Sequence, residues 1–218
     1  MCSMRGLNRF AAVPLLAVAL SACQTAATKP TVPPGEPVSL APAAFRCPAK
    51  GTTITFQDGR TATALDRHDD TCVYAVGTTT ETRIYSMSRT DQPRAERFRQ
   101  AMAKLWPLEV NKQAVADHDL ILTGDDDIDK KFSTEIEETI TVLRSERLTT
   151  PAGTFDTYVI ERAYKMLLRR THGRYLLWYD PNTGIVLKGV LEHAGGVRPR
   201  TPDFVVAHIG TSETSKAE

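Results

Sequence analysis

Four aspartates lie in the segment Asp125–Lys130, which is the densest group of potential ligand side chains in the sequence. Carboxylates at alternate positions are the first ligands of an EF-hand calcium loop. When such a loop is aligned on Asp125, however, Lys130 stands where the sixth position requires glycine, and Ile136 stands where the twelfth requires glutamate. The segment is therefore predicted to be a solvated loop and not a metal site.

Two histidines, His68 and His118, have aspartates as close neighbours in the sequence, and carboxylate–imidazole groups bind metals or transfer protons. Adjacent residues of a strand point to opposite faces, so neither group converges on one point by itself. The chain contains no Gly-x-Ser-x-Gly, His-Glu-x-x-His or phosphate-binding glycine loop. We therefore predict no catalytic residue, no metal ligand and no cofactor, and we expect a protein that is not an enzyme.

The N-terminus has the pattern of a secretory signal. Arg5 and Arg9 precede an apolar run from Phe10 to Leu20, and no acidic residue appears before Cys23. The run is shorter than the about 20 apolar residues that a membrane-spanning helix needs. It predicts export and not a transmembrane segment.

The end of this run, Leu20-Ser21-Ala22-Cys23, resembles the lipobox of bacterial lipoproteins. The resemblance implies that residues 1–22 are a cleaved lipoprotein signal peptide, and that acylated Cys23 anchors the protein in the lipid bilayer. Gln24, and not an aspartate, follows the cysteine, which implies the outer membrane, facing the periplasm, in preference to the inner membrane. The alternative is an ordinary cleaved signal in which Cys23 has no role.

The anchor also assigns the four cysteines. Cys2 leaves with the signal and Cys23 carries lipid, which leaves Cys47 and Cys72 as one pair in an oxidising compartment. A structural disulfide between them is the expected state. A redox or metal role is the rival interpretation, but the chain has no Cys-x-x-Cys motif to support it.

Charge and composition define the organisation of the rest of the chain. Loss of the two signal arginines leaves 25 basic and 26 acidic side chains, a formal charge of −1, which gives no electrostatic argument for nucleic acid. We predict a lipidated, proline-rich tether over residues 23–46, a single β-rich periplasmic domain over 47–209, and a polar C-terminal tail over 210–218.

Most of the domain has the composition and alternation of β-strands. The expected strands are 52–56, 61–65, 71–76, 82–87, 136–142, 157–161, 163–169, 174–179 and 184–192, with turns at 58–59, 171–173 and 180–184. Residues 94–106 carry apolar residues at helical spacing before Pro107, and form the one expected helix. A helix is an alternative for 136–142, but the density of Thr and Ile there favours a strand.

Three stretches, 105–112, 150–161 and 178–188, resemble in this order the uncharacterised DUF3108-type exported β-proteins of bacteria. Asn111 departs from that pattern, because glycine usually stands there. The resemblance implies a twisted antiparallel sheet that curls as a half-barrel over a helix, and it implies no reaction. The predicted fold class is therefore mainly β (α+β), a twisted antiparallel sheet or half-barrel meander with one helix packed on it.

Two segments near the end of the domain, 166–168 and 175–179, are apolar on both faces of their strands and must be covered on both. Either the helix and the N-terminal strands cover them, or one face is an open groove for a lipid, a peptide or another protein. The residues expected to line such a groove are Met166, Leu168, Tyr175, Leu177, Trp178 and Tyr179.

The leading hypothesis is a membrane-anchored periplasmic lipoprotein with a non-enzymatic binding or envelope-assembly role. Its partners would be the bilayer, through Cys23, and envelope proteins or a hydrophobic ligand, with no nucleic acid. The first alternative is a lipid or lipoprotein carrier whose half-barrel holds an apolar groove. The second is an envelope hydrolase, which would need catalytic groups that only the folded chain brings together.

Overall fold

The computed structural model describes residues 32–91, 95–123, 131–166, 170–196, 198 and 201–211, and of residues 118–123 and 131–134 the backbone alone. The predicted signal peptide, Cys23, the acidic segment 125–130, Leu168 and the side chain of His118 lie outside this description. What the sequence predicts for them stays a prediction.

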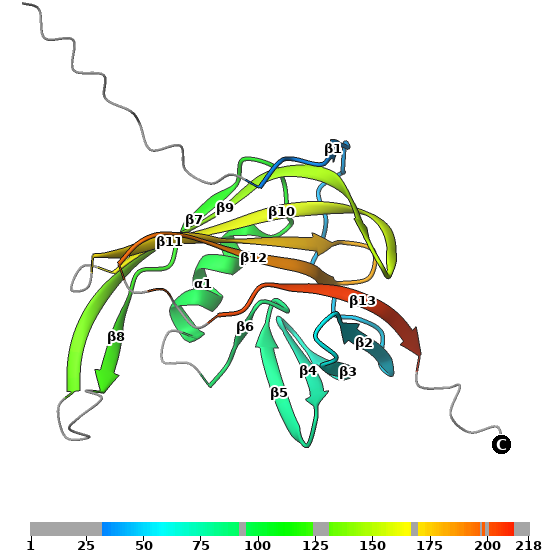
Figure 1. The fold of residues 1–218 in the computed structure, drawn as a ribbon, viewed down its shortest axis with the longest axis horizontal. Helices are drawn as coiled ribbons and strands as arrows, with labels where there is room; N and C mark the ends of the chain where they lie inside the picture. Colours follow the sequence, from blue (N-terminus) through cyan, green and yellow to red (C-terminus); the bar gives the residue numbers. More distant parts are fainter. Residues whose placement is uncertain are drawn as a thin grey trace, which may run out of the picture.

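Thirteen strands form one antiparallel, strongly curved sheet, and a single helix, α1, lies among the described residues (Figure 1). The strands follow one another in the order β1-β9-β10-β11-β12-β13-β2-β3-β4-β5-β6, and β7 and β8 also pair with β9. The predicted fold class is therefore confirmed. The element bounds are β1 Glu36–Pro37, β2 Thr52–Phe56, β3 Thr61–His68, β4 Thr71–Val76, β5 Thr79–Ile84, β6 Ser88–Arg89, α1 Ala95–Leu105, β7 Gln113–Val115, β8 His118–Thr123, β9 Lys131–Thr150, β10 Gly153–Met166, β11 Thr171–Asp180, β12 Ile185–Gly195 and β13 Phe204–Thr211.

The long strands β9–β12 form what we call the main sheet, which arches over α1 and over β2–β6, the N-terminal sheet (Figure 1). In β9, residues 135–142 alternate between exposed or half-buried and buried positions, with Ile136, Ile140 and Val142 buried. This period of two excludes the helix considered for the same segment.

β13 joins the two sheets. Its first residues, Phe204 and Val205, pair with β12, whereas Val206–Thr211 pair with β2, and the register shifts between Val206 and His208. Such a shift bends a strand and increases its twist. The sheet therefore bends sharply at β13 and folds back, so that the N-terminal sheet lies beneath the concave face of the main sheet.

Helix α1 packs against the same concave face. Phe98, Met102 and Leu105 recur at helical spacing, and all three are buried. They form one core with side chains of the concave face, Ile140, Tyr158, Ile160, Leu177 and Tyr179. The apolar stripe that predicts the helix is thus the stripe that it buries.

Residues 32–46, which we call the strap, pack along the domain and do not extend away from it. Its strand β1 pairs with β9, Ala43 pairs with Leu108, and the hydroxyl of Tyr158 donates a hydrogen bond to the Ala41 carbonyl at 2.8 Å. The described residues from Val32 onward therefore pack as part of the fold, whereas residues up to 46 were expected to form a tether. Proline is compatible with this role, because an edge strand can leave amide positions unpaired.

Several strand boundaries differ from those expected; β5, for example, spans Thr79–Ile84 and not 82–87. β10 runs through Arg162 without a break, because this arginine faces the interior and pairs with Glu138. β11 begins at Thr171, so residues 171–173, expected as a turn, belong to the strand. At the other end of the chain, β13 extends to Thr211, two residues into the expected tail.

Candidate binding cavity

A cavity of about 580 Å³ lies between the main sheet and the N-terminal sheet. This volume falls within the range of roughly 300–1,000 Å³ that is typical of sites for small molecules. The described part of its wall contains no histidine, aspartate or cysteine. The principal lining residues are Ile54, Phe56, Ala62, Tyr74, Val76, Glu81, Arg83, Ser88, Arg89, Glu138, Arg162, Tyr164, Met166, Tyr175, Leu177, Leu191 and Phe204.

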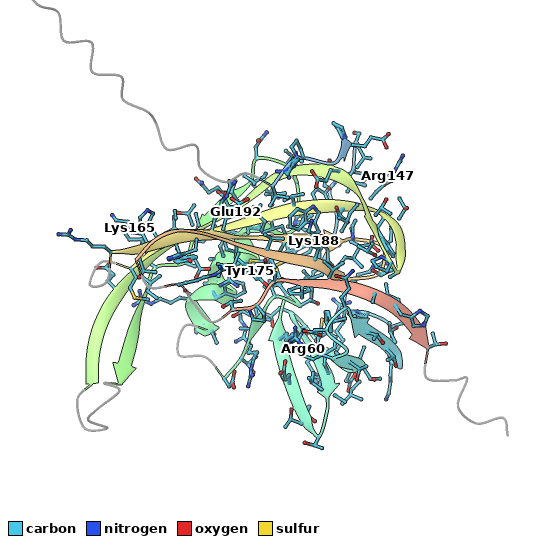
Figure 2. The ribbon with its side chains drawn as sticks, in the orientation of Figure 1. Arg60, Arg147, Lys165, Tyr175, Lys188 and Glu192 are labelled. Atoms are coloured by element: carbon cyan, nitrogen blue, oxygen red, sulfur yellow. A yellow bond between two sulfur atoms is a disulfide. The ribbon has the colours of Figure 1, made fainter. Side chains whose placement is uncertain are left out.

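The apolar part of the wall arises from the alternation of both sheets. In the N-terminal sheet, Ile54, Ala62 and Val76 lie side by side on β2, β3 and β4, so their side chains share the face that lines the cavity. On the opposite side, Tyr175 and Leu177 of β11 line the cavity from the main sheet. Figure 2 shows Tyr175 beneath the main sheet, on the side that faces the N-terminal sheet and Arg60.

One glycine shapes this wall. A Cβ atom at Gly189 would overlap the ring of Phe204 and the hydroxyl of Tyr175, so only glycine lets both rings lie across β12. The Tyr175 hydroxyl donates a hydrogen bond to the Pro202 carbonyl at 3.4 Å. Burial, together with the charge of Asp203, raises the pKa of Tyr175 to about 12, so the phenol is neutral in the physiological range.

A buried ion pair lies on the main-sheet side. Arg162 contacts Glu138 at 2.6 Å, and the two side chains are 9% and 3% exposed. The guanidinium group also lies over the ring of Phe98 from α1, 4.5 Å from its centre. The cation is thus held from two sides, by β9 and by the helix.

Three more arginines line the cavity from the N-terminal sheet. Arg83 and Arg89, on β5 and β6, share the carboxylate of Glu81 at 2.8 and 3.6 Å. Arg60, in the turn before β3, pairs with Asp58 at 2.6 Å, where both side chains are about half exposed. The inner face of this sheet therefore changes from apolar on β2–β4 to charged on β5–β6.

The six residues expected to line a groove have different places in the fold. Met166, Tyr175 and Leu177 line the cavity, whereas Tyr179 packs in the core around α1. Trp178 points to the opposite, convex face, where its indole nitrogen donates a hydrogen bond to Glu146 at 2.6 Å. Leu168 lies outside the described residues.

Trp178 and its neighbours are covered by the strap, which the sequence analysis assigned to a tether. The amide of Gly35 donates a hydrogen bond to Glu146 at 2.9 Å, and the amide of Val32 donates one to Glu192 at 2.8 Å. The N-terminal strands β2–β6 do lie opposite the main sheet, as one of the two alternatives predicted, but a cavity remains between the sheets. Which residues of β2–β6 line that cavity was not predicted.

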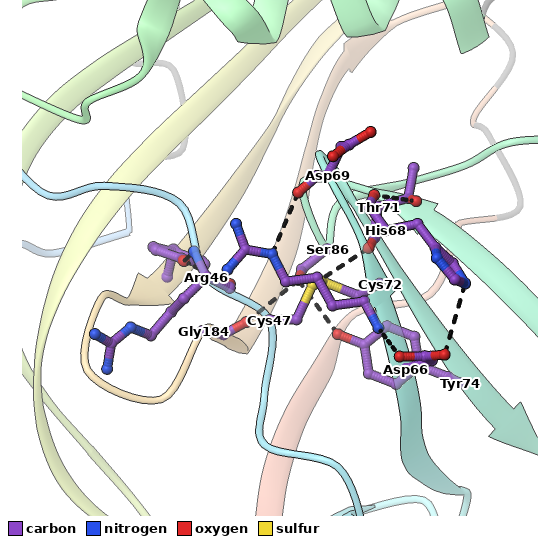
Figure 3. The surroundings of a disulfide bond; sticks show 12 residues. Arg46, Cys47, Asp66, His68, Asp69, Thr71, Cys72, Tyr74, Ser86 and Gly184 are labelled. Atoms are coloured by element: carbon purple, nitrogen blue, oxygen red, sulfur yellow. Dashed lines mark hydrogen bonds and ion pairs between the residues drawn. A yellow bond between two sulfur atoms is a disulfide. The ribbon is translucent and has the colours of Figure 1, made fainter.

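Cys47 and Cys72 form a disulfide that joins the end of the strap to β4 (Figure 3). Cys72 is buried, and the Ser86 hydroxyl lies 3.1 Å from its sulfur and 3.2 Å from the Tyr74 hydroxyl. Ser86 also donates a hydrogen bond to the Gly184 carbonyl at 3.3 Å. The disulfide is thus part of the packed core.

The histidine groups do not converge in the described part of the chain. His68 lies 3.7 Å from Asp66, and both side chains are mostly exposed (Figure 3). No three side chains of His, Cys, Asp or Glu come close enough to hold a metal ion among the residues that the structure describes. Within the same residues, no helix has the length and apolar character needed to cross a membrane.

No protein-family model and no curated protein matches the chain. Among solved structures, it is similar to the hypothetical lipoprotein YmcC from Escherichia coli (K12), with a TM-score of 0.42 and 11% identity, covering 72% of this chain and 82% of that chain. It is also similar to a putative lipoprotein from Parabacteroides distasonis, with a TM-score of 0.38 and 13% identity, covering 78% of this chain and 100% of that chain. At these scores and identities the similarity does not establish a shared function.

Proposed function

We propose that this protein is a lipid-anchored protein of the bacterial envelope that binds a small apolar or amphipathic ligand in the cavity between its two sheets. The observation that carries the proposal is the cavity itself, whose volume of about 580 Å³ suits such a ligand and whose wall is apolar over β2–β4 and β11. This combines the leading hypothesis, a non-enzymatic binding module, with the alternative of a half-barrel carrier.

Acylation of Cys23 and a location at the outer membrane are part of the same proposal. Cys23 would be acylated after removal of residues 1–22, and the domain would face the periplasm from the outer membrane, as Leu20-Ser21-Ala22-Cys23 and Gln24 suggest. The resemblance of 105–112, 150–161 and 178–188 to DUF3108-type proteins is in keeping with this location. Cys23→Ala is expected to move the protein from the membrane to the soluble fraction, and continued membrane binding of that variant would contradict acylation at Cys23.

Ligand binding can be tested with the full chain carrying Cys23→Ser, which cannot be acylated at this position and needs no detergent. We expect the neutral fluorescent probe N-phenyl-1-naphthylamine to bind it saturably, because the probe is apolar and small enough for the cavity. Replacing Val76, on the cavity wall, by tryptophan should fill the space and weaken binding at least tenfold.

Val73→Trp is the matched control, because Val73 lies on the same strand but does not line the cavity. It should bind the probe as the parent does. Absence of saturable binding, or equal loss of binding in both variants, would contradict the proposed function.

A further inference from the structure

We propose that the ligand of this cavity is a single-chain amphiphile with an anionic headgroup, and that Arg83, Ser88 and Arg89 receive that headgroup. This inference rests on the proposed function and adds to it the chemical class of the ligand. We call the three receiving residues, which lie on β5 and β6, the basic edge of the cavity.

The volume limits the ligand to one chain. If each non-hydrogen atom takes about 30 Å³, the share of one water molecule in the liquid, a cavity of 580 Å³ holds roughly twenty such atoms. One acyl chain with a small headgroup has about this size. A lipid with two long chains exceeds it.

The wall has an apolar part and a charged part, as an amphiphile does. Ile54, Ala62 and Val76 line the cavity on β2–β4, whereas the basic edge lies on the two outermost strands of the same sheet. A chain placed along the apolar strands would bring its headgroup to β5 and β6. Burial of each CH₂ group there is favourable by the ordinary hydrophobic effect.

The sign of the headgroup follows from the charges of the basic edge. Arg83 and Arg89 share the single carboxylate of Glu81, so the lining of this part carries one more positive than negative charge. Arg89 also contacts Asp91 at 2.6 Å, but Asp91 does not line the cavity and its side chain is 59% exposed. Exposed pairs of this kind contribute little stability, so an anion can replace Asp91 as the partner of Arg89.

Ser88 independently indicates that the ligand has a hydrogen-bond acceptor at the basic edge. The residue is 5% exposed and lines the cavity, and its hydroxyl has no hydrogen-bond partner among the residues that the structure describes. Buried hydroxyl groups in folded proteins normally have a partner. A carboxylate or phosphate oxygen beside Arg89 would accept this hydrogen bond, and guanidinium groups bind both anions in a bidentate manner.

The test compares four amphiphiles of equal chain length by their displacement of N-phenyl-1-naphthylamine from the Cys23→Ser full chain. Dodecanoate and dodecyl phosphate, the two anions, are expected to bind at least tenfold more tightly than dodecanol, and dodecylamine is expected to bind most weakly. Arg89→Gln and Arg83→Gln should each weaken anion binding about tenfold. Glu81→Gln should strengthen it, because the shared carboxylate is removed.

Arg147→Gln is the matched control, since Arg147 is a half-exposed arginine paired with two carboxylates, on β9 and away from the cavity (Figure 2). Urea unfolding of each variant verifies the fold, and each affinity is compared with that of the Cys23→Ser parent. Equal affinities for dodecanoate and dodecanol, or tighter binding of dodecylamine, would overturn the anionic headgroup and leave the proposed function standing. Failure of the neutral probe itself would instead overturn the proposed function.

Discussion

The Arg162–Glu138 pair is the most deeply buried ion pair that the structure describes, at 9% and 3% exposure. Ion pairs at such depth contribute little net stability, because the desolvation of both charges offsets their attraction. Removal of one partner, however, takes a close counter-charge from the other in a site of low dielectric. Arg162 thus has a structural role at the cavity wall, in addition to its contact with Phe98 of α1.

Arg162→Met is therefore expected to lower the free energy of unfolding by about 3–5 kcal/mol. The double variant Arg162→Met/Glu138→Leu should recover at least half of that loss, because no buried charge remains. Lys165→Met is the control on the same strand, where Lys165 and Glu137 form an exposed pair at 3.3 Å. Lys165→Met should lower the free energy of unfolding in urea by less than about 1 kcal/mol. An equal loss in Arg162→Met and in Arg162→Met/Glu138→Leu would show that a buried charge deprived of its close counter-charge is not the cause.

Gly189 offers a second residue-scale prediction. Gly189→Ala places a Cβ atom against the Phe204 ring and the Tyr175 hydroxyl, neither of which is the free end of a flexible chain. We expect a loss of about 1–3 kcal/mol and weaker binding of the neutral probe. Gly210→Ala on β13 meets only His208, at 3.2 Å, and should be nearly neutral in the same unfolding assay.

At the scale of the elements, the strap depends on two carboxylates of the main sheet. Burial raises the pKa of Glu146, but hydrogen bonds from Arg144, Trp178 and the Gly35 amide, together with the charge of Arg144, outweigh burial and lower it. Glu146 thus binds the Gly35 amide of the strap most strongly while it is ionised.

The sign of the resulting pH dependence follows from this direction. The folded-state pKa of Glu146 lies below the ordinary value of 4.5, so its stabilisation is present above pH 4.5 and is lost as the pH falls through the folded-state pKa. Glu146→Gln should lower the free energy of unfolding at pH 7. The difference in this free energy between the variant and the parent should become smaller at acidic pH.

Urea unfolding followed by tryptophan fluorescence measures both effects, since Trp178 donates a hydrogen bond to Glu146. Glu36→Gln is the control, because Glu36 lies on the strap itself and is 68% exposed. A pH dependence that is unchanged in Glu146→Gln would show that other groups set it.

The disulfide joins the other end of the strap to β4, across 25 residues of sequence. A crosslink over this separation restricts the unfolded chain and stabilises the fold by roughly 3.5 kcal/mol in the chain-entropy model. Cys47→Ala/Cys72→Ala is expected to lower the free energy of unfolding by about 2–5 kcal/mol. Reductant should lower the stability of the parent to a similar degree, and a reductant effect in the double variant would point to another cause.

At the scale of the whole molecule, the strap places the domain close to Cys23, the proposed site of acylation. The chain joins the main sheet at Val32, whose amide donates a hydrogen bond to Glu192 on the convex face, and the cavity lies on the concave side. Val32 is nine residues after Cys23. At no more than about 3.6 Å per residue, these residues can span roughly 32 Å.

If Cys23 is acylated, the domain therefore lies within about 30 Å of the bilayer. Neutron reflectometry of the lipidated protein on a supported bilayer would measure this gap. Insertion of a glycine–serine spacer after Gln24 should widen it. A gap wider than the fully extended residues allow would mean that the strap is released or that the anchor lies elsewhere.

Local patterns were sufficient to predict much of this molecule. The stripe of Phe98, Met102 and Leu105 predicted α1, and the alternation around Ile140 predicted a strand. The turn predicted at 180–184 is present, and the glycine that ends it, Gly184, has a φ of +74°. These features depend on neighbours in the sequence, and their period is visible without a fold.

Tertiary structure alone decided what covers each face. Trp178 and Leu177 are adjacent and both apolar, yet one lies under the strap and the other lines the cavity. The pairing of β13 with both β12 and β2 creates the cavity, and it depends on a register shift and on twist summed over many strands. Alternation shows that a strand has two faces, but only the folded chain determines what lies against them.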